Sequence, residues 1–139
     1  MHDIKERLSL LWLFALLNYL YADVTGLWDI IGTPNFHMHL PPLALMASAV
    51  LMEIPMAMIV AARLLPYRAN RAANIVFSTI VTVVNAFLTY VPPLAGWGKT
   101  PALPEYLFFA TIETVCTLII IRQAWTWTAD EKILKGALQ

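Results

Sequence analysis

The chain has few charged residues and no net charge. Asp, Glu, Lys and Arg make up 13% of its 139 residues, 60% are hydrophobic, and the mean hydropathy is +0.67. Soluble domains carry about 25% charged residues, so this composition excludes an ordinary soluble domain. Nine Lys and Arg balanced by nine acids form no basic surface for nucleic acid. We therefore expect a membrane protein with no nucleic-acid partner.

Cysteine is almost absent, and histidine is sparse. Cys116, the only cysteine, lies in an apolar run, which excludes an intrachain disulfide, a CxxC redox pair and a cysteine zinc cluster. His37 and His39 would need metal ligands from elsewhere in the chain, and neither is placed to ligate a haem inside a bundle. The sequence therefore predicts neither a metal site nor a cofactor.

Four apolar segments are long enough to cross a bilayer core of about 30 Å as helices. They are residues 8–28, 42–65, 72–91 and 105–127. Short connections place sequential helices antiparallel, which predicts one all-α domain over residues 1–139, a transmembrane up-down-up-down four-helix bundle. The charged start MHDIKER leads into a run without a small-residue cleavage site before its end, so we expect this run to be a retained span.

The basic residues predict the orientation of the bundle. Lys99 alone lies on one side, and the other eight basic residues lie opposite: Lys5, Arg7, Arg63, Arg68, Arg71, Arg122, Lys132 and Lys135. Because Lys and Arg are enriched in cytoplasmic segments, both termini are expected in the cytoplasm. The tryptophans agree with this orientation, since each is expected at a membrane interface with its indole N–H in water. Trp12, Trp125 and Trp127 would lie inside, and Trp28 and Trp97 outside.

The second segment carries an acid and a proline at its middle. Facing lipid at a helix centre would cost Glu53 about 2.5–3.5 kcal/mol, so we expect it to face the protein interior or a wet cavity. Pro55 cannot donate a hydrogen bond to the carbonyl of Leu51, so the helix should bend there. A carboxyl group and a free carbonyl would then lie within about one turn of each other at mid-depth.

Polar residues from all four segments fall within one band of depth. At about 1.5 Å per residue, Asn18 and Glu53 lie near mid-depth. The others lie in the outer half: Asp23, Asn85 and Glu113. If they all face inward, they line one acidic pocket that opens outward and has no Lys or Arg at its depth. Removal from water without a cationic partner favours the neutral acid, and two acids in one site titrate as a coupled pair.

A purely structural role for the same residues stays open. Asn, Thr and protonated Glu also join helices by hydrogen bonds worth about 0.6–2 kcal/mol each. Asp23 would lie at the outer interface if the first span were shifted by a few residues. Acids inside a membrane are functional by default. The candidate ligand-binding residues are therefore Glu53, Glu113, Asp23, Asn18 and Asn85, and no catalytic residue is assigned.

Three stretches of the chain carry a family resemblance. They read LWLFALLNYLYADV, LMEIPMAMIVAARLLPYRANRAANI and IETVCTL. Together they resemble a family of small, uncharacterised bacterial integral membrane proteins, over nearly the whole chain. The resemblance implies a four-span protein of the bacterial inner membrane with no assigned activity. Small multidrug transporters have a similar size, but they depend on a first-span acid, and here the central acid lies in the second span.

Three functions remain open. The first is an acidic pocket that binds or transports a small lipophilic or cationic molecule, with Glu53 and Glu113 exchanging protons. The second is an acid-base enzyme, an isomerase or cyclase, that acts on a lipophilic substrate with paired acids. The third is a structural subunit of a membrane complex. Membrane lipids are expected partners in each case. The small volume enclosed by four spans is compatible with a homodimer, although the sequence has no decisive small-xxx-small seam for one.

Overall fold

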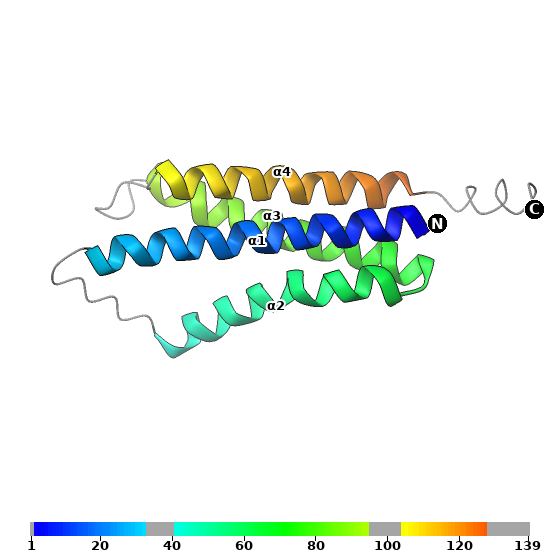
Figure 1. Cartoon of the computed structure of the whole chain (residues 1–139), viewed down its shortest axis with the longest axis horizontal. Coiled ribbons are helices and arrows are strands. Elements are labelled where there is room, and N and C mark those ends of the chain that lie inside the picture. The colour runs from blue at the N-terminus through cyan, green and yellow to red at the C-terminus, as the bar shows by residue number, and fades with distance from the viewer. Residues whose placement is uncertain (1, 33–40, 95–103, 128–139) are drawn as a thin grey trace, which may run out of the picture.

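The computed structural model describes residues 2–32, 41–94 and 104–127, which form four α-helices. These are α1 (His2–Gly32), α2 (Pro42–Leu64), α3 (Tyr67–Leu94) and α4 (Pro104–Thr126). Sequential helices run antiparallel (Figure 1), which confirms the predicted all-α four-helix bundle. Each helix contains a segment long and apolar enough to cross a membrane: Asp3–Leu27, Leu45–Leu64, Tyr67–Val91 and Leu107–Thr126. These features indicate a multi-pass membrane protein.

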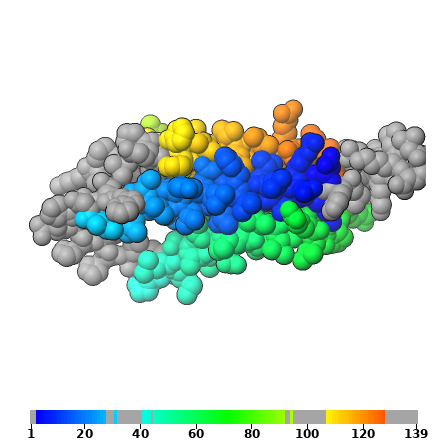
Figure 2. All heavy atoms as spheres, viewed as in Figure 1, coloured from blue at the N-terminus to red at the C-terminus, as the bar shows by residue number. Residues whose placement is uncertain are grey.

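The helices are not packed equally. α1 packs against α4 and α2, whereas α3 packs against α4 and more weakly against α2. α1 and α3 therefore separate α2 from α4 (Figure 1). The core lies where α1, α3 and α4 meet the second half of α2, and its fully buried members include Leu8, Trp12, Ala62 and Ile120. Figure 2 shows the start of α2 protruding from this body.

α2 changes direction near its middle (Figure 1), as the position of Pro55 predicts. The proline lies inside the helix and is buried, and it has no N–H to donate to the preceding turn. All side chains described between Pro42 and Val50 are exposed, whereas Met58 and Ala62 after the bend are buried. The bend thus divides α2 into a half that stands off from the bundle and a half that packs into it.

Buried amides join α3 to α1 and α2 at one end of the bundle. The Trp12 indole N–H donates to Asn74 Oδ1 at 2.8 Å, and Asn74 Nδ2 donates to Asn70 Oδ1 at 2.6 Å. Asn70 Nδ2 then donates to the carbonyl of Ala62 at 2.6 Å. Trp12, Asn70 and Asn74 are all fully buried. Every polar atom in this chain of bonds is paired inside the protein, which a low-dielectric site requires.

The expectation that each indole N–H lies in water is therefore wrong for part of the set. Trp12 is fully buried and Trp127 is 2% exposed, because Asn74 and the Tyr67 ring provide partners inside the bundle. Trp125 is 65% exposed. The side chains of Trp28 and Trp97 lie outside the described residues, as do Lys99, Lys132 and Lys135.

α1 and α3 begin earlier than their apolar segments, at His2 and Tyr67. The additional turns carry basic residues that bind the ends of neighbouring helices. Lys5 Nζ donates to the carbonyl of Leu65 at 2.6 Å, just beyond the end of α2. Arg71 donates to the carbonyls of Ala124 and Trp125, both at 3.1 Å, in the last turn of α4. Both cations thus lie where a helix has unpaired carbonyls and the negative end of its dipole.

Candidate functional site

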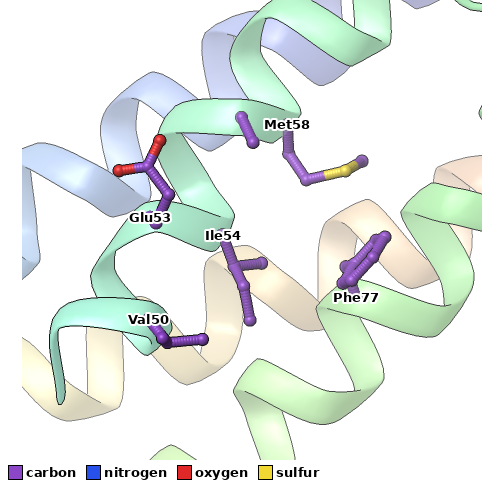
Figure 3. A pocket seen from close by; sticks show the side chains of 6 residues that line it. Val50, Glu53, Ile54, Met58 and Phe77 are labelled. Carbon is purple, nitrogen blue, oxygen red and sulfur yellow. The ribbon is translucent and has the colours of Figure 1, made fainter. Parts of the chain in front are cut away.

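An open hollow of about 240 Å³ lies between α2 and α3 (Figure 3). It is lined by Val50, Glu53, Ile54, Ala57, Met58 and Phe77. Phe77 belongs to α3 and the other lining residues to α2, where three- and four-residue spacings place side chains on neighbouring positions of one face. The hollow lies beside the bend at Pro55, where α2 turns away from the bundle. Its wall is almost entirely apolar, and the carboxyl group of Glu53 contributes little to it.

Glu53 stands at the edge of this hollow. Its side chain is exposed, and Figure 3 shows the carboxyl group turned away from Val50, Ile54 and Phe77. Among the described residues it has no hydrogen bond or ion pair. It also lies in the middle of the apolar segment Leu45–Leu64. A carboxyl group at that depth is costly unless a proton or a cation neutralises it.

A second acid, Glu113, is buried between α3 and α4. It is 2% exposed, and its Oε2 accepts a hydrogen bond of 3.1 Å from Asn85 Nδ2. The same amide group lies 3.3 Å from the carbonyl of Ala110. Thr89 Oγ1 donates to Asn85 Oδ1 at 3.2 Å, which fixes the orientation of the amide. Asn85 therefore holds the Glu113 carboxyl from α3 and is itself held by the next turn of its own helix.

The remaining oxygen of this carboxyl group differs. Glu113 Oε1 is fully buried and has no hydrogen-bond partner within the described part of the chain. The nearby hydroxyls are engaged elsewhere, since Thr114 donates to the carbonyl of Ala110 at 2.8 Å and Thr117 to that of Glu113 at 3.0 Å. A buried carboxyl oxygen without a partner is costly, and it marks a place where an exogenous group would be stabilised.

Asp23 and Asn18 lie on α1. Asp23 is exposed, and its carboxyl group is near enough to that of Glu113 for the two to interact electrostatically. Asn18 is buried, but its amide donates to the carbonyl of Phe14 at 2.8 Å, within its own helix. Asp23 thus belongs with the Glu113 site, whereas Asn18 satisfies its amide locally.

The candidate residues are therefore divided between two places. The structure brings Asn85 and Glu113 together, with Asp23 nearby. Glu53 lies on α2, which α1 and α3 separate from α4. The hollow at Glu53 is not lined by any of the other candidates. The reason is that α2 packs on the α1 side of the bundle, and the bend at Pro55 turns the half of α2 before this proline away.

The apolar lining of the hollow was not predicted. Ile54, Ala57 and Phe77 look in the sequence like lipid-facing or core residues. Ile54 and Ala57 were signalled only by their proximity to Glu53 and Pro55, and Phe77 on α3 had no signal. His37 and His39 lie outside the described residues. The described residues contain no group of three or more His, Cys, Asp or Glu side chains that could hold a metal ion.

A sequence profile for a family of unknown function, DUF6326, matches residues 1–134. The chain is a member of the DUF6326 family. This confirms the expected membership of an uncharacterised family. Searches among curated proteins and among solved structures found no match to this DUF6326 protein. Its function must therefore be argued from the two acid sites.

Proposed function

We propose that this DUF6326 protein binds a small lipophilic cation in the hollow between α2 and α3, with Glu53 as the counter-charge. The observation that supports the proposal is the position of Glu53: an exposed acid in the middle of a membrane-length helix, without a partner among the described residues, at the edge of an apolar hollow. A ligand with an apolar body and one positive charge satisfies both parts of this site. The proposal includes transport of the same ligand across the membrane.

The lining residues suit such a ligand. Phe77 and Met58 suit the apolar body of the ligand, because a ring offers a large apolar surface and a thioether adapts to irregular shapes. The volume of about 240 Å³ is below the roughly 300–1,000 Å³ of usual small-molecule sites. The ligand is therefore small, or it leaves part of its surface in contact with lipid.

Binding is proposed to release a proton from Glu53. A carboxyl group at this depth is least costly when neutral, and it stays neutralised if an organic cation replaces its proton. Because the proton and the cation compete for one carboxylate, the apparent affinity should rise with pH by up to about tenfold per unit while the free site is protonated. Only one of the lining residues is titratable, which favours binding over acid-base catalysis with paired acids.

We also propose that the protein resides in the bacterial cytoplasmic membrane with both termini inside. Support comes from the basic residues at the end of the bundle where α1 begins, which include Lys5, Arg63, Arg68 and Arg71. An Arg68→Cys variant tests the orientation, because Cys116 is buried and gives little background. An impermeant thiol reagent should label Arg68→Cys only after the cells are opened, and labelling in intact cells would reverse the topology.

Equilibrium binding of benzyltrimethylammonium tests the ligand proposal. Titrations use the full chain in nanodiscs of uncharged lipid, with empty nanodiscs to correct for partitioning. The uncharged analogue neopentylbenzene separates the contribution of charge from that of shape. Wild type should bind the cation saturably and more tightly at higher pH, and Glu53→Gln should lose at least about tenfold in affinity and the pH dependence.

Glu6→Gln is the matched control, because Glu6 is also an exposed acid but lies in the first turns of α1. It should bind the cation as wild type does. Equal affinity of wild type and Glu53→Gln at every pH, or equal affinity for the cation and neopentylbenzene, would remove the proposal.

A further inference from the structure

The Glu113 site contains a buried anionic group without a cationic partner. Glu113 Oε1 is fully enclosed and unpartnered within the described part of the chain, and the nearest interacting charge, Asp23, has the same sign. Two carboxylates near each other in an apolar environment repel, so a cation or a proton has to neutralise at least one of them. None of the described side chains around Glu113 supplies such a species, which points to one taken up from solution.

The groups around Glu113 identify that species. α1 contributes Asp23, and α4 contributes the Cys116 thiol, which donates to the carbonyl of Leu11 at 3.3 Å. α3 contributes the neutral Asn85. α2 makes no extensive contact with α4. Lys and Arg are absent from this set.

A proton fits this site better than a metal ion. Hard cations such as Ca²⁺ or Mg²⁺ take about six or more oxygen ligands. Here Glu113 Oε2 and Asn85 Oδ1 already accept hydrogen bonds, and the Thr114 hydroxyl donates to a carbonyl. Glu113 Oε1 and the nearby Asp23 carboxyl group are left, which is too few oxygens for such a metal ion, whereas a proton needs only one.

We infer that Glu113 is a second proton-binding site of this protein and that Asp23 is the group through which its proton exchanges with the exterior. Asp23 is exposed, whereas Glu113 is enclosed. In the inward step the Asp23 carboxyl O–H bond breaks and an O–H bond forms at Glu113 Oε1, which leaves Asp23 ionised until it takes a proton from outside. Asn85 donates to Oε2 in both states and so keeps the carboxyl in place. This inference does not rest on ligand binding at Glu53.

Infrared difference spectroscopy tests the inference directly. The full chain carries Glu53→Gln, so that a carbonyl band of Glu53 does not contribute, and no organic cation is present. Lowering the pH from about 9 to about 5 should produce the C=O stretching band of a protonated carboxyl group. Adding Glu113→Gln should abolish the buried, slowly deuterated part of this band, and Glu6→Gln should leave it unchanged. A buried band of equal size with and without Glu113→Gln overturns the inference.

Two more variants test the roles of the neighbours. Asn85→Leu removes the hydrogen bond to Oε2, so the band frequency should rise. An unchanged frequency would overturn the assignment to Glu113, even if Glu113→Gln failed to fold. Asp23→Asn should keep the band but slow its appearance after a pH jump by about tenfold or more. An unchanged rate in Asp23→Asn would overturn the exchange route. If Na⁺ is added at high pH in place of acid, the infrared bands of the ionised Glu113 carboxylate should remain.

Discussion

The indole N–H of Trp12 donates a 2.8 Å hydrogen bond to the side-chain oxygen of Asn74, and both side chains are fully buried. Through Asn70 the same network reaches the carbonyl of Ala62. The first turns of α3 are thereby fixed to α1 and to the packed half of α2. This hydrogen-bonded end of the bundle contrasts with the half of α2 before Pro55, whose described side chains from Pro42 to Val50 are exposed.

Replacing Asn74 should destabilise the bundle. Asn74→Leu keeps the volume but leaves the Trp12 indole N–H without an acceptor, which should cost about 1–2 kcal/mol of unfolding free energy. The free energy of unfolding is measured from the loss of helical circular dichroism during titration with a denaturing detergent. Trp125→Phe is the control, because Trp125 is 65% exposed, and it should change stability by less than about 0.5 kcal/mol. Equal stability of wild type and Asn74→Leu would show that the network contributes nothing.

Arg71 should hold the end of α4, whereas Arg68 should not. Arg71→Gln removes the charged donor from the carbonyls of Ala124 and Trp125. The free energy needed to open the last turn of α4 should fall by about 1 kcal/mol, which raises its amide exchange rate about fivefold. Hydrogen-deuterium exchange of the segment ending at Thr126 measures this change. Arg68→Gln is charge-matched and has an exposed side chain, and it should leave the exchange rate as in wild type. Identical effects of the two variants would assign the result to net charge instead.

Straightening α2 should weaken ligand binding. Pro55→Ala restores an N–H that can donate to the carbonyl of Leu51. The half of α2 before residue 55 should therefore realign with the half after it. Val50 and Glu53 would then move relative to Met58 and Phe77, and the affinity for benzyltrimethylammonium should fall severalfold. Distances between spin labels on the start of α2 and on α1 report the bend. A straight helix with unchanged affinity would show that the bend does not shape the hollow.

The sequence predicts the helices of this protein better than their rotations. The segments followed from length and hydropathy, and the bend followed from Pro55, because both depend on local chemistry. Which side Glu53 faces depends on packing, and α2 is apolar nearly all round, so periodicity does not identify its buried face. The Glu113 and Asn85 pair fell within the predicted depth band, but their contact depends on the rotation of α3 against α4.

The buried amides near the start of α3 were missed for a similar reason. Asn70 and Asn74 lie in YRANRAAN close to Arg68 and Arg71, a pattern typical of a solvated turn. Their burial follows from partners on other helices, the Trp12 indole and the Ala62 carbonyl, which no local pattern indicates. A tryptophan in a membrane protein is usually interfacial, and it is buried only where its N–H finds an acceptor.

The most direct test of the account places a reporter inside the hollow. Met58 lines the hollow, whereas Met46 lies near the start of α2 and is 65% exposed. With ¹³C-labelled methionine methyl groups, benzyltrimethylammonium should shift the Met58 resonance saturably in wild type and leave Met46 nearly unchanged. The Met58 shift should disappear or need at least about tenfold more ligand in Glu53→Gln. An unperturbed Met58 resonance at saturating ligand, or the same titration curve in Glu53→Gln, would contradict cation binding at Glu53.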